Sequence, residues 1–247
     1  MTQNVDAANP TIVLVHGAFA DSSSWNAILP NLLDQGYPVI AAAVPLRGLQ
    51  IDSDFVAAVL TSISGPVVLV GHSYGGSVIT NAATQVNNVV SLVFISGPAL
   101  DAGESTGDAV NRFPGSTLDG KLTMVPLPNG DTDIYLQQDK FWQQFCADIP
   151  ESDAKLIAVG QRPFTDRALN EKSGEPAWKT IPSRFIYGEL DKNIPAAAHA
   201  FMAKRAGSVE TVEVKGSSHV VMLSHPDAVL QLIQNAISAS TATPAAA

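Results

Sequence analysis

Short runs of consecutive apolar residues, many of them β-branched, recur along the chain and are separated by stretches whose apolar positions follow a helical period. Such runs are typical of strands that are buried on both faces of a sheet. The expected strands are Thr11–Val15, Tyr37–Val44, Val67–Val70, Val89–Ile95, Ser183–Gly188 and Val209–Val214. Because these strands alternate with helical stretches, the pattern predicts an α/β fold with a mostly parallel, doubly wound sheet.

The stretches between the runs have apolar residues at three- and four-residue spacing, which is typical of helices that pack on a sheet. Before the first of them, Asp21 and the serines at 22–24 can cap the helix, and Gly36 can end it. Pro226 suits the first turn of the last helix. The expected helices are Trp25–Gln35, Ser53–Ser64, a stretch from Ser77 to Gln85, Pro195–Ala206 and Pro226–Ser240.

The alternation of strands and helices stops after Pro98 and resumes at Ser183. Residues 99–181 contain scattered Gly, Pro and Asp, with helical pieces expected at Ile134–Ala147 and Glu151–Val159. We interpret this segment as an inserted, mainly helical lid over the carboxyl ends of the strands. Residues 1–98 and 182–240 would then form the core, and the Ala-rich residues 241–247 a disordered tail.

The stretch Val67–Gly76 reads Val-Val-Leu-Val-Gly-His-Ser-Tyr-Gly-Gly and carries the strongest chemical signal in the chain. Its Gly-x-Ser-x-Gly pattern lies between a buried strand and a helix, which is the setting of a nucleophile elbow. The sharp turn is expected to strain the backbone of Ser73, and small residues at Gly71 and Gly75 allow strand and helix to approach. Ser73 is therefore the candidate nucleophile.

A serine hydroxyl needs a base within hydrogen-bond reach, and the base needs a carboxylate to orient it. In a parallel sheet such groups lie just past the carboxyl ends of strands. Asp191 follows the strand Ser183–Gly188 and is the expected acid, with Glu189 as the second candidate. Asp is also common in turns and helix caps, so position alone does not distinguish these roles.

His219 follows the last strand in a loop of small residues and is the expected base. His225 competes with it, but His225 precedes Pro226 at the entry of a helix. The remaining histidines have plainer interpretations. His16 flanks the first loop, His72 is the variable position of the elbow, and His199 falls in a helix expected at the surface.

The reaction also needs donors for a developing oxyanion. The backbone N–H of Tyr74, directly after the nucleophile, is one expected donor. The second is expected in the loop His16-Gly-Ala-Phe19, with the Ala18 N–H preferred and Phe19 next, because Gly17 lets the backbone turn in closely.

Composition restricts the partners. The chain has 247 residues, a formal net charge of −9 and one cysteine, Cys146. The negative charge argues against nucleic acid or an anionic membrane as partner, and a single cysteine excludes an intrachain disulfide, as in a cytoplasmic protein. Residues 1–10 lack the features of a secretory signal, and no apolar run reaches membrane-spanning length. No phosphate-binding glycine loop and no metal-ligand spacing of histidines occurs, so we expect neither cofactor nor metal.

Taken together, these motifs resemble the serine α/β-hydrolases, in particular the small esterase branch that contains plant methyl-ester esterases and hydroxynitrile lyases. The resemblance implies an eight-stranded sheet, although little chain precedes Thr11, and it carries over the triad Ser73, Asp191 and His219. Branches with an aspartate nucleophile do not match Ser73. Hydroxynitrile lyases have lysine after the catalytic histidine, where this chain has Val220. The matching motifs are His16-Gly-Ala-Phe19 with Ser23-Ser-Trp25, Gly71–Gly76, Gly188–Asp191 with Ile194-Pro195, and Ser218-His219 with Ser224-His-Pro226.

The sequence thus predicts a carboxylesterase that cleaves small, largely apolar esters through an acyl-enzyme on Ser73 and works as a monomer or homodimer. Phe19, Trp142, Phe164 and Trp178 are expected to form an apolar pocket, although aromatic residues of a lid often belong to its own core. Two alternatives stay open. The same triad could cleave C–C bonds or lactones or perform perhydrolysis, or the chain could be a ligand-binding receptor with slow residual hydrolysis.

Overall fold

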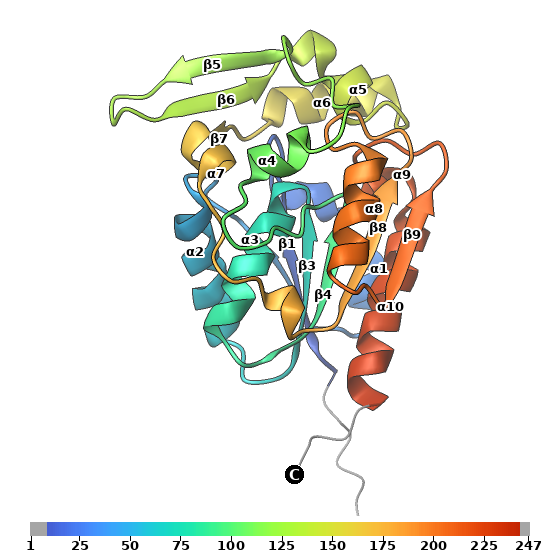
Figure 1. Ribbon diagram of the computed structural model, residues 1–247. Helices are drawn as coiled ribbons and strands as arrows, with labels where there is room; N and C mark the ends of the chain where they lie inside the picture. Colours follow the sequence, from blue (N-terminus) through green and yellow to red (C-terminus); the bar gives the residue numbers. More distant parts are fainter. Residues whose placement is uncertain (1–8, 243–247) are drawn as a thin grey trace, which may run out of the picture.

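A six-stranded sheet forms the centre of the computed structural model, which describes residues 9–242 (Figure 1). The strand order is β2-β1-β3-β4-β8-β9, and every neighbouring pair is parallel. The central strands are apolar on both faces because helices cover the sheet on both sides. The strands are β1 (Thr11–Val15), β2 (Val39–Ala42), β3 (Val67–His72), β4 (Val89–Ile95), β8 (Ser183–Gly188) and β9 (Glu210–Val214).

Helices lie on both faces of this sheet (Figure 1). In the view of Figure 1, α3 (Tyr74–Ala82) and α8 (Ala196–Arg205) lie in front of the strands, and α2 (Leu49–Thr61) packs beside α3. Behind the strands lie α1 (Leu29–Asp34) and α10 (Pro226–Ala242). This arrangement confirms the predicted α/β class with a doubly wound parallel sheet. Short pieces complete the core: α9 (Val221–Ser224) and the 3₁₀ turns η1 (Ser22–Trp25) and η2 (Ala83–Gln85).

The predicted helix Trp25–Gln35 is split into η1 and α1. The expected cap is present, since the Asp21 carboxylate accepts the Ser23 N–H at 2.8 Å. Helix α2 starts at Leu49, earlier than expected, directly after Gly48. The described part of the chain has six strands in its main sheet, not the eight that the resemblance implies. Among residues 9–242, no strand before β1 pairs with this sheet.

Between β4 and β8 most of the chain forms a layer across the upper end of the sheet, and its last part, with η3, returns along α3 to the start of β8 (Figure 1). Beside the expected helices, it contains a three-stranded antiparallel sheet of order β5-β6-β7, which the sequence pattern did not predict. The elements are α4 (Thr106–Asn111), β5 (Leu122–Pro126), β6 (Thr132–Leu136), α5 (Gln138–Phe145), α6 (Glu151–Gly160), β7 (Phe164–Thr165), α7 (Asp166–Asn170) and η3 (Ala177–Lys179).

The helix predicted from Ile134 was wrong in its first residues, because Ile134 and Leu136 lie in β6 and helix α5 begins at Gln138. Strand β6 pairs with β5 through a turn in which Gly130 has a φ of 90°. An Asn-Gly pair such as Asn129-Gly130 is typical of a hairpin turn, which explains why a hairpin forms where the apolar pattern predicts a helix. The helix expected at Glu151–Val159 is present as α6.

Helix α10 continues to Ala242, so the first two residues of the expected tail are helical. Residues 243–247 of that tail lie outside the described part of the chain, as do residues 1–8. Among the helices that the structure describes, none is long and apolar enough to cross a membrane.

Candidate active site

Ser73 stands between the end of β3 and the start of α3 in a backbone conformation that non-glycine residues rarely adopt, with φ 50° and ψ −130°. A Cβ on Gly75 would lie 2.2 Å from the Val15 carbonyl oxygen of β1, and one on Gly71 would lie 2.6 Å from the Gly75 carbonyl oxygen. Only glycine therefore fits at these two positions. The turn presents the Ser73 side chain at the upper end of the sheet.

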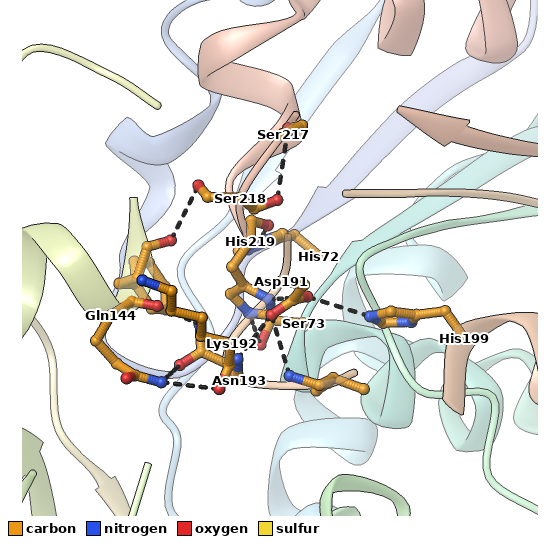
Figure 2. Close-up of polar contacts among 12 residues, drawn as sticks. His72, Ser73, Gln144, Asp191, Lys192, Asn193, His199, Ser217, Ser218 and His219 are labelled. Carbon is orange, nitrogen blue, oxygen red and sulfur yellow. Dashed lines mark hydrogen bonds and ion pairs between the residues drawn. The ribbon is translucent and has the colours of Figure 1, made fainter. Parts of the chain in front are cut away.

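The imidazole of His219 lies against this serine. Its Nε2 is 2.7 Å from the Ser73 Oγ, within hydrogen-bond distance (Figure 2). His219 lies between β9 and α9, so it follows a strand that is three positions away from β3 in the sheet. The side chain is buried, with 1% of His219 exposed, which keeps water from competing for the bond. The geometry allows His219 to take the serine proton.

Asp191 lies on the other side of the same imidazole. Its Oδ2 is 2.6 Å from His219 Nδ1, while its Oδ1 accepts the backbone N–H groups of Asn193 at 2.8 Å and Ile194 at 3.0 Å. The second candidate, Glu189, instead pairs with Lys215 at 2.9 Å on the surface. The structure therefore brings Ser73, His219 and Asp191 together and leaves Glu189 outside.

The electrostatics of the pair favour an ionised acid. Burial on its own would raise the pKa of the Asp191 carboxyl, but the charge of His219 and the hydrogen bonds from His199 and His219 outweigh burial and hold the pKa well below its usual value. An ionised Asp191 accepts the Nδ1–H of His219, which leaves the lone pair of Nε2 facing the serine hydroxyl.

Ala18 and Tyr74, which line the same cavity as Ser73, have backbone amides without an acceptor among the described residues. The Phe19 amide, the second choice in this loop, is occupied because it donates to the Arg162 carbonyl at 3.0 Å. A Cβ on Gly17 would lie 2.6 Å from the Ser73 Cβ, so glycine is needed for this loop to pass the serine.

The sequence pattern predicted that His199 lies in a surface helix, and this was wrong. Only 1% of His199 is exposed, and its Nε2 is 3.2 Å from the Asp191 Oδ2. His72 is also buried and donates from Nε2 to the His219 carbonyl at 3.1 Å. His16 accepts the Val44 N–H at 3.0 Å and thereby fixes the first loop. The His225 ring bonds to the hydroxyl of its neighbour Ser224, at 3.0 Å.

Side chains from the insertion hold both loops that carry the acid and the base. Asp148, between α5 and α6, accepts the Ser218 N–H and the Ser217 hydroxyl, each at 2.9 Å, and also the Ser218 hydroxyl. Gln144 of α5 donates to the Lys192 carbonyl at 2.9 Å and to the Asn193 Oδ1 at 3.1 Å (Figure 2). No local sequence pattern marks these two residues, because their partners lie far along the chain.

A cavity of about 690 Å³ opens above the serine. Of the four aromatic residues expected there, Phe19 and Phe164 line it and are 5.4 Å apart in an edge-to-face contact. Phe145, which the sequence did not single out, lines it as well. The Trp142 and Trp178 indoles do not belong to its described lining, because Trp142 donates to the Ile149 carbonyl at 3.0 Å and Trp178 to the Leu100 carbonyl at 2.8 Å.

The cavity lining is mixed. Beside aromatic and aliphatic side chains it includes polar groups of α4 and of the segment after α7, among them the ion pair Lys172–Asp108 at 2.6 Å. The described residues contain no group of three or more His, Cys, Asp or Glu that could hold a metal ion. The arrangement can support nucleophilic attack by Ser73.

Comparison with known proteins gives consistent findings. Residues 12–232 match the family model described as "Alpha/beta hydrolase family". The chain is 26% identical to alpha/beta hydrolase nvfD of Aspergillus novofumigatus, over 92% of this chain and 96% of that protein. It is 26% identical to putative methylesterase 13, chloroplastic, of Arabidopsis thaliana, over 90% of this chain but 54% of that protein, so it spans about half of that relative. The crystal structure of polyneuridine aldehyde esterase superposes with a TM-score of 0.77 at 21% identity, covering 92% of this chain and 98% of that one.

Proposed function

Because the chain belongs to the alpha/beta hydrolase family, we propose that it is a serine carboxylesterase that cleaves small, largely apolar carboxylic esters through an acyl-enzyme on Ser73. One observation carries this proposal. A continuous line of hydrogen bonds joins Ser73 Oγ, the His219 imidazole and the Asp191 carboxylate at a cavity whose lining includes the aromatic rings of Phe19, Phe145 and Phe164. Relatives with the name methylesterase support the choice of ester chemistry.

In the first half of the reaction, Ser73 Oγ attacks the ester carbonyl carbon while His219 Nε2 takes the hydroxyl proton. The carbonyl oxygen becomes an oxyanion and accepts the N–H groups of Ala18 and Tyr74. The proton then passes from His219 to the leaving alkoxide oxygen, so the C–O bond breaks and the alcohol departs. Asp191 stays ionised throughout and stabilises the imidazolium.

In the second half, water takes the place of the alcohol. His219 accepts a proton from the water, whose oxygen attacks the acyl carbon on Ser73. The same two amides stabilise the second tetrahedral intermediate. Return of the proton from His219 to Ser73 Oγ releases the carboxylic acid and restores the free enzyme.

The proposal is tested with a panel of p-nitrophenyl esters of rising acyl chain length, with aryl esters and lactones alongside. We expect turnover of short and aromatic esters by the wild type and a loss of at least about a thousandfold in kcat in Ser73→Ala, with unchanged circular dichroism. Full esterase activity in Ser73→Ala would show that the mechanism is wrong.

The alternatives predict other outcomes in the same assays. A receptor with residual hydrolysis would bind ester analogues tightly and complete only a few turnovers per hour. A lactone or C–C hydrolase would favour its own substrates over every simple ester by a large ratio of kcat/KM. Turnover, measured as product per active site, distinguishes these outcomes.

A further inference from the structure

Asp191 receives a second imidazole that the mechanism above does not use. Its Oδ2 is 2.6 Å from His219 Nδ1 and 3.2 Å from His199 Nε2, and the two rings approach it from different sides (Figure 2). The other oxygen, Oδ1, accepts two backbone N–H groups. Each carboxylate oxygen therefore has two donors, so the carboxyl plane has one orientation in which all of them are satisfied.

His199 is itself held rigidly. It lies in the first turn of α8, and its ring stacks on the Tyr187 ring of β8, with centroids 5.1 Å apart and planes at 18°. Tyr187 comes from the strand that leads to Asp191, so the stack joins the acid loop to α8. Burial lowers the pKa of His199, although its bond to Asp191 opposes the change, so the ring is a neutral donor at physiological pH.

A neutral donor on Oδ2 has two effects on the pair beside it. It fixes the position of the oxygen that orients His219. It also shares the negative charge of that oxygen, which weakens the pull of Asp191 on the His219 proton. From this geometry, and on the premise of the proposed function, we infer that His199 is a positioning residue that sets the orientation and basicity of His219 through Asp191.

The other ionisable groups around this pair do not explain such an effect. His72, from the end of β3, has a ring 4.9 Å from that of His219, but burial, followed by the charge of His219, lowers its pKa to about 3. Burial raises the pKa of Tyr187. Asp148, beside Ser218, stays ionised, because its hydrogen bonds lower its pKa despite burial. None of these three changes charge between about pH 5 and 8.

Two variants of His199 separate donation from packing. His199→Phe keeps a ring to stack on Tyr187 but removes the N–H. His199→Gln places an amide N–H near the position of the lost Nε2. His225→Phe is the matched control, since His225 lies outside the site and bonds to Ser224. All three are compared with the wild type by pH profiles of kcat and kcat/KM, with active sites counted by phosphonate labelling of Ser73.

In His199→Phe we expect kcat to fall about tenfold and the acid limb of kcat/KM to move up by about half to one pH unit, with KM little changed. His199→Gln should recover most of both values, and His225→Phe should match the wild type. A purely structural role would lower the thermal midpoint or the count of active sites without moving the limb. An unmoved acid limb and an unchanged kcat per active site in His199→Phe would overturn the inference.

A second readout needs no substrate. The low-field proton resonance of His219 Nδ1–H and its titration midpoint can be followed by NMR in the free protein. We expect His199→Phe to move that midpoint upward and His199→Gln to restore it. If the wild type hydrolyses no ester, the proposed function fails while this titration still decides the role of His199. If esters are hydrolysed and the midpoint does not move, the role of His199 fails alone.

Discussion

Asp148→Ala removes the carboxylate that ties the loop before His219 to the insertion. The substitution takes away the acceptor of three hydrogen bonds, from the Ser218 N–H, the Ser218 hydroxyl and the Ser217 hydroxyl. Hydrogen bonds to a charged group contribute about 1.5–3 kcal/mol each in buried sites. Since Asp148 is half-buried and water can replace part of the loss, about 1 kcal/mol for each bond gives about 3 kcal/mol in the free energy of unfolding.

The same change should affect turnover, because Ser218 directly precedes His219. The His219 Nε2 stands 2.7 Å from Ser73 Oγ in the intact protein. A displacement of about 1 Å in such a contact costs about a hundredfold in rate. We therefore expect kcat of Asp148→Ala to fall by about tenfold to a hundredfold, with a smaller change in KM.

Urea unfolding at several pH values measures the stability term. The folded-state pKa of Asp148 is lowered, since its hydrogen bonds outweigh the effect of burial. The contribution of Asp148 to the free energy of unfolding is therefore fully present above the unfolded-state pKa of about 3.9, and it is lost as pH falls through the folded-state pKa. The difference in unfolding free energy between wild type and variant should be constant near neutral pH and shrink below about pH 4.

Asp153→Ala is the control, because Asp153 is an exposed residue of the nearby α6. It should change the unfolding free energy by less than about 0.5 kcal/mol and leave kcat unchanged. The reasoning is refuted if Asp148→Ala unfolds at the same urea concentration and turns over as fast as Asp153→Ala.

Three further substitutions test other parts of the site. Gly75→Ala should lower the free energy of unfolding by more than about 3 kcal/mol or prevent folding, because the new Cβ would lie 2.2 Å from the Val15 carbonyl oxygen. Gly65→Ala is the control, since a Cβ there has no atom within 4 Å, and the thermal midpoints of the two variants are compared. Asp52 of α2 accepts the Tyr74 hydroxyl at 2.7 Å, and burial raises the pKa of its carboxyl. The free energy of unfolding of the wild type should therefore fall as pH rises from about 4 through the folded pKa, and urea unfolding of Asp52→Asn should lack this fall. Phe164→Leu should raise KM for aromatic esters about fivefold with kcat kept, and equal effects on aryl and alkyl esters would contradict its place in the wall.

The parts of the site that the sequence could predict are those set by local structure. The Gly-x-Ser-x-Gly turn follows from neighbours in the chain, and the structure places Ser73 at such a turn. Asp191 and His219 could be chosen because each comes directly after a strand, and parallel strands end at the same edge. The strands themselves were readable because burial on both faces makes them apolar throughout.

What the sequence could not predict depends on contacts between distant segments. His199 shows only a helical spacing, and nothing local indicates that it meets Asp191. Gln144 and Asp148 read as ordinary polar residues near helix ends, yet their partners lie in loops after β8 and β9. The prediction that Trp142 and Trp178 line the pocket was wrong for the same reason, since tertiary packing decides which carbonyl an indole N–H binds.

The insertion also has a consequence for how the chain is made. Strands β4 and β8 pair in register, with Leu92 beside Ser183, although about 90 residues separate them. Closing a loop of that length costs about 4 kcal/mol of chain entropy before the pairing is gained. During synthesis from the N-terminus, β4 therefore presents an open edge on the ribosome until β8 emerges, and such edges attract chaperones. Because the acid and the base follow β8 and β9, the nascent protein acquires its chemistry only with its last quarter.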